Sequence, residues 1–204
     1  WNNHRRHPCA FAGVTASAAA ALLWLPTLRP PPTQASLPTA QLVQIRLETL
    51  SGTRSIPPGT DTLVAAAPHE RVVAHLDSHL VGLAPASRIR VVDANRDALR
   101  VRLDSGALSA SVDPLRAGQS FTVMANGYEV RVVGTLFGVQ LDPNGELDVA
   151  LVHGRVEVTT PDGAREVLTA DERLHFARGG VVQRTTLSQN EQGQVAARLR
   201  LDAG

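Results

Sequence analysis

The sequence of 204 residues has room for one ordinary domain plus a terminal anchor or tail. Twenty basic and nineteen acidic residues give a net charge of +1, so net charge alone predicts no affinity for nucleic acid or for a membrane surface. The single cysteine, Cys9, excludes an internal disulfide and a Cys-based zinc site. All basic residues are Arg and none is Lys, which we attribute to the codon usage of GC-rich bacterial DNA.

The N-terminal part has the pattern of a membrane anchor. Residues 1–7 form a short basic stub that contains Arg5 and Arg6, and residues 8–28 carry no charge. About twenty apolar residues are enough for a helix to span a bilayer, and the flanking arginines indicate that the stub stays in the cytoplasm. We therefore predict one transmembrane helix over residues 8–28. Its many alanines also fit a cleaved signal peptide, and a soluble helix is a third alternative.

The remainder is organised as a linker, a β domain and a tail. Residues 29–40 are rich in Pro, Thr and Ser, which is typical of an extended, solvated linker. Residues 41–185 contain about fifteen short runs with a side-chain period of two, separated by turn clusters, and no useful helical period. This spacing is typical of sandwiches, barrels and β-solenoids. Residues 186–204 form the tail, in which Ser188 and Glu191 have capping-box spacing and predict one short helix.

Several turn clusters separate the expected strands. Asp104-Ser105-Gly106 is predicted to turn the chain between two strands, and Asp142-Pro143-Asn144-Gly145 is predicted to close a hairpin. Strands are expected over Gln41–Leu47, Thr62–Ala67, Glu70–Leu76, His79–Leu83, Arg88–Val92, Leu99–Leu103, Leu108–Val112, Tyr128–Val132 and Leu147–Leu151, and further strands around Phe121, Phe137, Val156, Val167, Leu174 and Val181–Thr185.

Two groups of side chains invite a metal interpretation. His69, His75 and His79 lie within eleven residues. On one strand His75 and His79 would be about 13 Å apart, too far for one ion. A turn between them is the alternative that would bring them together as cross-strand neighbours. Asp142, Asn144 and Glu146 begin like a calcium loop, but an EF-hand needs Gly at the sixth position and Glu at the twelfth, where this sequence has Leu147 and His153. Solvated turns explain both groups better, and we predict no metal and no cofactor.

Catalytic patterns are not visible either. No serine stands in a Gly-x-Ser-x-Gly elbow, and Gly134 and Gly138 flank a strand of bulky residues instead of opening a helix as a phosphate-binding loop does. We therefore predict that the protein is not an enzyme. Arginines on the polar strand faces indicate a solvated, salt-bridged face or, alternatively, a partner-docking surface with Tyr128 as an aromatic anchor. These arginines are Arg88, Arg90, Arg100, Arg102, Arg131 and Arg155.

Six ordered signposts over about 115 residues resemble the FecR family of sigma-factor regulators. The most specific is "VRVVGTLFGV", in which Gly134, Thr135 and Phe137 fit the family signature Gly-Thr-x-Phe. The other signposts are "ERVVAHLDSHLVGLAPASRIRV", the corner that ends in Gly106, the strand that begins at Phe121, "VALVHGRVEV" with Gly154, and "LTADERL", where Asp171 replaces a usual Gly.

The resemblance implies an all-β FecR domain, β-solenoid-like or a layered stack of short strands, held outside the bacterial inner membrane. It also implies that a periplasmic signal, in some members from a TonB-dependent receptor, passes inward to a sigma factor through protein–protein contacts, as in anti-sigma factors. In the family a cytoplasmic anti-sigma segment precedes the span, whereas only seven residues precede it here, so the sequence is a fragment or a stand-alone variant. The alternative is an exported all-β module for adhesion or carbohydrate binding.

Overall fold

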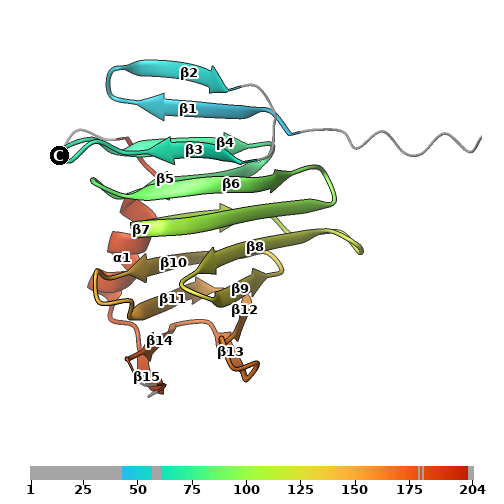
Figure 1. The fold of residues 1–204 in the computed structure, drawn as a ribbon, viewed down its shortest axis with the longest axis vertical. Helices are drawn as coiled ribbons and strands as arrows, with labels where there is room; N and C mark the ends of the chain where they lie inside the picture. The colour runs from blue at the N-terminus through green and yellow to red at the C-terminus, as the bar shows by residue number, and fades with distance from the viewer. Residues whose placement is uncertain (1–42, 57–60, 179, 181, 202–204) are drawn as a thin grey trace, which may run out of the picture. The chain divides into compact units, whose positions relative to one another are not determined.

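The fold was analysed in a computed structural model that describes residues 43–56, 61–178, 180 and 182–201. The described part is all-β, as predicted, with fifteen strands and one short helix (Figure 1). In chain order the strands are β1 (Ile45–Thr49), β2 (Gly52–Ile56), β3 (Thr62–Ala65), β4 (Val72–Leu76), β5 (His79–Leu83), β6 (Arg88–Ala94), β7 (Ala98–Val112), β8 (Ser120–Ala125), β9 (Tyr128–Val132), β10 (Thr135–Leu141), β11 (Leu147–His153), β12 (Arg155–Thr159), β13 (Arg165–Thr169), β14 (Glu172–Phe176) and β15 (Val182–Thr186). The helix, α1 (Gln189–Ala197), follows β15 and begins with the capping box that the sequence predicts.

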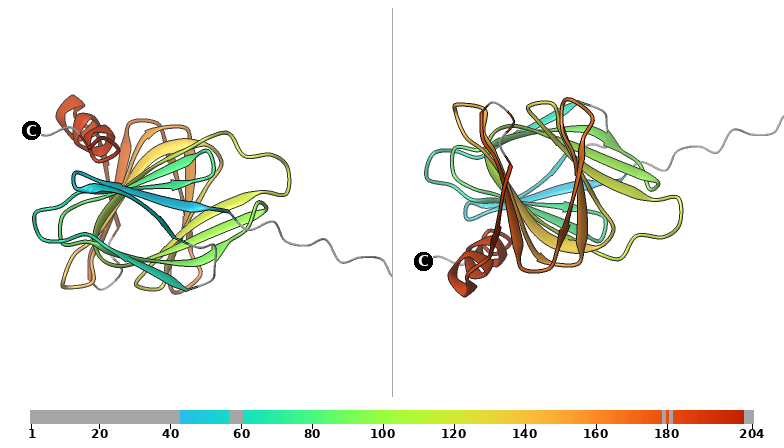
Figure 2. Two further views of the ribbon diagram at one scale, coloured as in Figure 1. Left: turned by 90° about the horizontal axis from the view of Figure 1, so that it is seen from above. Right: turned by 90° about the horizontal axis from the view of Figure 1, so that it is seen from below.

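The strands form two layers that share β7 and enclose one core (Figure 2). The arginine layer, named for its outer face, has the order β3-β6-β7-β8-β9-β12-β13. The helix layer, which carries α1 outside, has the order β2-β1-β4-β5-β7-β10-β11-β14-β15. The inner faces are lined with Val, Leu, Ile and Ala, because few aromatic residues are available.

The long strand β7 passes from one layer to the other at Gly106. Residues 98–105 pair with β6 and β8 in the arginine layer, and residues 106–112 pair with β5 and β10 in the helix layer. Before the bend the residues that face the core have odd numbers: Leu99, Val101 and Leu103. After the bend they have even numbers: Leu108, Ala110 and Val112. One residue is therefore out of step, and the register of β6 with β7 shifts there, at Arg88 and Ile89.

Two sequence expectations are corrected by this topology. The cluster at residues 104–106 is not a turn between two strands, because the chain bends there within β7. No strand is expected between Leu47 and Thr62, yet Gly52–Ile56 forms the edge strand β2. Among the described strands, every pairing is antiparallel except that of β7 with β8, so the fold is a layered stack and not a coil of parallel strands.

The predicted transmembrane helix over residues 8–28 lies outside the described residues. Within the described ranges, the chain contains no helix with the length and apolar character needed to cross a membrane.

The bend at Gly106 gives the first testable prediction. Gly106 has φ +84°, and a Cβ atom there would lie 2.8 Å from Ser87 Cα and 2.4 Å from Ser87 Oγ. Because Ser87 Oγ also accepts the buried Ala107 N–H at 2.9 Å, it is not free to move away. We expect Gly106→Ala to lower the free energy of unfolding by about 2 kcal/mol or more, measured by urea denaturation.

Gly118→Ala is the matched control, because Gly118 has φ +90° and open space around its Cα. Gly118→Ala introduces the same backbone strain without a steric clash, so we expect its free energy of unfolding to fall by only about 1 kcal/mol. Equal losses for the two variants would show that contact with Ser87 does not matter.

Candidate functional site

The family-signature residues lie in the core and at one corner. Phe121 of β8 and Phe137 of β10 are fully buried and meet edge to face, with ring centroids 6.3 Å apart. Gly134 and Gly154 have φ +117° and +99°, and a Cβ on Gly154 would lie 2.6 Å from both Gly134 O and Thr135 Cγ2. These residues therefore hold strands together and offer no reactive group to a ligand.

The predicted arginines gather on one surface, the outer face of the arginine layer. Arg90 lies directly opposite Arg102, and Arg131 opposite Thr122 and Glu157. Asp104 contacts Arg102 at 2.9 Å and Arg90 at 3.9 Å, so this carboxylate compensates two adjacent cations. The structure thus shows a partly ion-paired face on which Arg88, Arg100 and Arg155 also lie.

Tyr128 does not belong to that face. It shares the inward side of β9 with Val130 and Val132, and its ring packs on Phe176 with centroids 4.9 Å apart. The expectation of an aromatic anchor beside the arginines is therefore wrong, because the period of two places Tyr128 on the opposite side of the strand from Arg131.

The three histidines are not brought together. His75 and His79 flank the β4–β5 turn and pair with Leu80 and Leu76, so they point to opposite sides of the layer. His75 contacts Glu48 at 3.1 Å on the outer side, whereas His79 faces Phe121. In residues 43–56 and 61–201, as far as they are described, no group of three His, Cys, Asp or Glu side chains could hold a metal ion.

The candidate calcium loop is a closed hairpin turn between β10 and β11. Asp142 Oδ1 accepts the Glu146 N–H at 2.8 Å, and Asp142 Oδ2 accepts from Asn144 Nδ2 at 3.2 Å. The carboxylate of Asp142 is therefore used by the turn itself.

A polar cavity of about 440 Å³ lies where the β4–β5 and β6–β7 turns meet the loop before β8. His79, Arg96, Arg116 and Gln119 contribute to its wall. Gln119 joins the loops, because it accepts the Arg116 N–H at 2.9 Å and donates to Arg96 O at 2.8 Å. The wall contains no Trp, Tyr or Phe among the described residues, so it offers no stacking surface for a sugar ring.

The outer face of the helix layer has a second distinctive feature, a row of small residues across four neighbouring strands. Gly82 of β5, Ser109 of β7, Gly138 of β10 and Ala150 of β11 are direct cross-strand partners. We call these four residues the small-residue row. Outward strand positions usually carry polar side chains, whereas three of the four residues in this row are Gly or Ala.

Helix α1 lies on this row. A Cβ atom on Gly82 would be 2.0 Å from Arg198 O, and one on Gly138 would be 3.2 Å from Val195 Cγ2. The glycines therefore allow the helix backbone to approach the sheet closely. Val195 is the one buried residue of α1, and a cavity of about 220 Å³ remains between the helix and the sheet.

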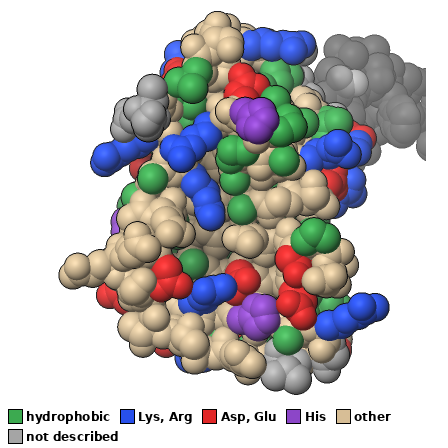
Figure 3. Space-filling view, turned by 90° about the vertical axis from the view of Figure 1, so that its left-hand side faces the viewer, with side chains coloured by type: hydrophobic (Ala, Val, Ile, Leu, Met, Phe, Trp, Pro, Cys, Tyr) green, Lys and Arg blue, Asp and Glu red, His purple; other side chains and the backbone are tan. Residues whose placement is uncertain are grey.

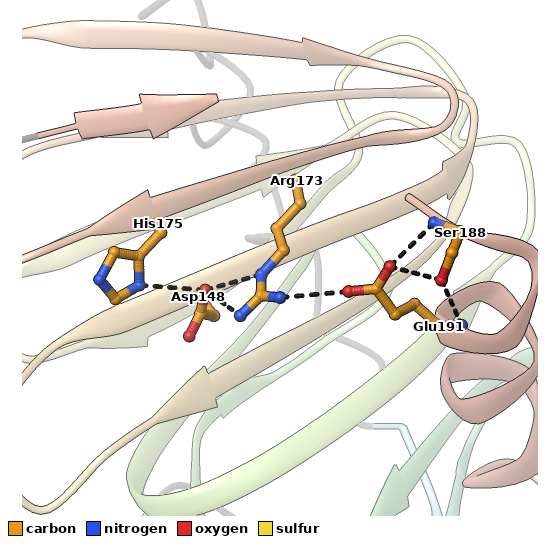
Figure 4. A network of polar contacts seen from close by, with 5 residues as sticks. All are labelled: Asp148, Arg173, His175, Ser188 and Glu191. Carbon is orange, nitrogen blue, oxygen red and sulfur yellow. Dashed lines mark hydrogen bonds and ion pairs between the residues drawn. The ribbon is translucent and has the colours of Figure 1, made fainter. Parts of the chain in front are cut away.

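A polar network joins α1 to the next strands (Figure 4). Glu191 accepts the Ser188 N–H at 2.8 Å within the capping box and contacts Arg173 of β14 at 3.2 Å. Arg173 and His175 both contact Asp148 of β11, at 2.7 Å and 3.1 Å. The hydrogen bonds from Ser188, followed by the charge of Arg173, lower the pKa of Glu191. Glu191 is therefore a carboxylate at neutral pH and can hold both partners.

Figure 3 views the side that carries α1, where side chains of both charges surround the hollow beside the helix. The sequence prediction found the helix cap but missed the small-residue row. The sequence feature that could have revealed this row is the occurrence of small residues at outward positions of four predicted strands: Gly82, Ser109, Gly138 and Ala150.

These features define the chain as a layered β protein with surfaces suited to macromolecular contact. Comparison with known proteins then gives a match of residues 61–157 to the FecR protein family. This confirms the resemblance seen in the sequence. No match was found among curated proteins.

Two solved structures share the fold. They are crystal structures, at 2.50 and 1.65 Å resolution, of a "putative anti-sigma factor" from Parabacteroides distasonis. Each has a TM-score of 0.58 and 20% sequence identity over 65% of this chain. The chain spans 62% and 63% of the length of those two structures.

His79 gives a second testable prediction. Burial lowers the pKa of His79 below its ordinary value, and the charges of Asp113 and Asp77 offset this only in part. The unfolded chain therefore binds the proton more readily, so stability is complete above pH 6.5 and falls as the pH drops through the lowered pKa. Neutral His79 also accepts the Asp113 N–H through Nδ1, at 3.3 Å.

We expect the free energy of unfolding in urea to decrease between pH 7.5 and pH 5, and His79→Asn to remove part of this decrease. Asn keeps an acceptor near the position of Nδ1 but does not titrate. His69→Asn, at an exposed position, is the control and should retain the slope of the unaltered chain. An unchanged slope for His79→Asn would contradict the assignment.

Proposed function

We propose that this chain is a membrane-anchored regulatory protein of the FecR type that relays an extracytoplasmic signal to a sigma factor through protein–protein contacts. The observation that carries the proposal is the FecR match over residues 61–157. The two-layer β fold shared with the Parabacteroides structures supports it. Partners by family resemblance are a sigma factor and a TonB-dependent receptor, and the proposal includes no nucleic acid.

The physical basis of such a relay is a population shift. A periplasmic partner that binds one conformation of the β domain more tightly than another changes the balance between them, and only this difference in affinity can carry a signal. No reaction is needed, which agrees with the structural use of the signature residues around Phe121 and Gly134.

The proposed location is the inner membrane, with residues 1–7 in the cytoplasm, residues 8–28 in the bilayer and the β domain in the periplasm. The uncharged segment and the Arg pair before it support this orientation. The linker of residues 29–40 would then separate the membrane from the first described residue, Val43.

Gene deletion tests the regulatory function. We expect deletion to change the transcripts of one sigma-factor regulon by several-fold, measured by RNA sequencing in the source bacterium. The full-length gene should restore the pattern. A gene in which a cleavable signal peptide replaces residues 1–28 should not restore it, because the β domain would reach the periplasm without its anchor. Unchanged sigma-dependent transcripts after deletion would disprove the proposal.

Thiol labelling tests the orientation. In spheroplasts, a membrane-impermeant maleimide is expected to leave Cys9 unlabelled and to label a Ser51→Cys, Cys9→Ser variant, because Ser51 is exposed on the β domain. Mass shift on a gel measures the labelling. Labelling of Cys9 in intact spheroplasts would show that the N-terminus is not in the cytoplasm.

A further inference from the structure

The hydroxyl of Ser109 has no partner, although it lies beneath α1. Ser109 is fully buried in the small-residue row, and its Oγ makes no hydrogen bond. The helix places the apolar Val195 over this part of the row: the same Cβ position on Gly138 is 3.2 Å from Val195 Cγ2 and 3.5 Å from Ser109 Oγ. A buried hydroxyl left unpaired costs free energy, because it loses the hydrogen bonds that water would make.

The rest of the contact is also weakly held. Val195 is the one buried side chain of α1, and a Cβ atom added at Gly193 in the middle of the helix would meet nothing within 4 Å. The ion pair of Glu191 with Arg173 is more than a third exposed at both side chains, and such pairs contribute little. Glycine in a helix interior also lowers helix stability.

The C-terminal end of α1 is placed unfavourably. Burial lowers the pKa of Arg198, and the charge of Arg71 lowers it further. A partly buried cation near a second cation opposes the seating of this end of the helix. Helix α1 therefore lies close against Gly82 and Gly138 but leaves the hydroxyl of Ser109 unpaired.

We propose that the small-residue row is a docking groove for a helical segment of a protein partner, and that α1 is an intramolecular placeholder which this segment displaces. The seated helix shows the chemistry that the groove accepts. Glu191 and Val195 are four residues apart and thus on one helix face. Glu191 contacts Arg173, and Val195 lies against Gly138, next to Ser109 in the row. The partner helix keeps the carboxylate and carries Thr or Ser where α1 carries Val195.

A hydroxyl at the position of Val195 would supply the hydrogen-bond partner that Ser109 Oγ lacks when α1 is seated. Thr has the shape of Val with one methyl replaced by a hydroxyl, so it fills the same space and can pair with Ser109 Oγ. At an ordinary apolar contact the change from Val to Thr weakens binding, because it buries an unpaired polar group. At this groove it strengthens binding, and the sign of the effect is diagnostic.

The test uses the purified full-length chain with Glu191→Arg, which removes the capping box and places a cation against Arg173 without altering the row. Hydrogen exchange is expected to show α1 amides at least about 100-fold less protected than β10 amides in this variant. Asn190→Arg, an exposed change in the same helical turn, is the control that keeps α1 docked.

Two fluorescent peptides of residues 187–201, the native sequence and one with Val195→Thr, are then titrated and followed by anisotropy. We expect the Val195→Thr peptide to bind the Glu191→Arg chain about tenfold more tightly. Adding Ser109→Ala to the chain is expected to reverse the preference, because the threonine hydroxyl then loses its partner. The Asn190→Arg chain is expected to bind both peptides much more weakly, since its own helix competes.

Three results would each overturn the proposal: α1 amides that exchange only with the core strands in the Glu191→Arg chain, no saturable binding of either peptide to that chain, or a native peptide that binds at least as tightly as the Val195→Thr peptide. The proposal uses no part of the sigma-factor assignment, and purified components keep the two tests separate.

Discussion

The passage of β7 through both layers is the constraint on which the rest of the structure depends. Because the two halves of this strand face one core, the buried parity must change between Leu103 and Leu108. Gly106 absorbs the extra residue at φ +84° against Ser87, where a side chain has no room. The remaining strands add outward from β7, so the arginine face and the α1 face lie on opposite outer sides of one core.

The two outer faces differ in the kind of residue at their outward strand positions. On the arginine layer the outward positions carry long charged side chains, which remain solvated. On the helix layer Gly82 and Gly138 weaken their own strands, since glycine in a strand costs about 0.5 to 1 kcal/mol relative to Ala. The close approach of α1 explains why glycine stands at these positions, because any Cβ on Gly82 would overlap the carbonyl of Arg198.

Local patterns were sufficient to predict the strands but not their arrangement. The alternation along Tyr128–Val132 and Leu147–Leu151 predicted buried and exposed sides that the structure shows. The same alternation placed Tyr128 inside, although nearness in sequence to Arg131 had suggested a shared surface. Residues 104–106 were predicted to form a turn, because Asp, Ser and Gly favour a change of chain direction. A bend within a strand uses the same residues, so the local sequence does not distinguish the two. The docking of α1 depends on strands that are far apart in sequence, so no local pattern could show it.

The distribution of aromatic side chains limits how a partner can recognise the β domain. Among the described residues, Phe121, Phe137 and Phe176 are fully buried and Tyr128 packs inward, so neither outer face presents the aromatic anchors that dominate many interfaces. A contact on the arginine face therefore depends on charge, which is screened by salt and gives little discrimination among acidic surfaces. The small-residue row offers close backbone approach and one unpaired buried hydroxyl, and a helix that fails to pair with Ser109 leaves that hydroxyl unsatisfied. Discrimination by an unsatisfied polar group is strong even when the contact area is small, so the row, once α1 is displaced as we propose, is better able than the arginine face to distinguish one helical partner from another.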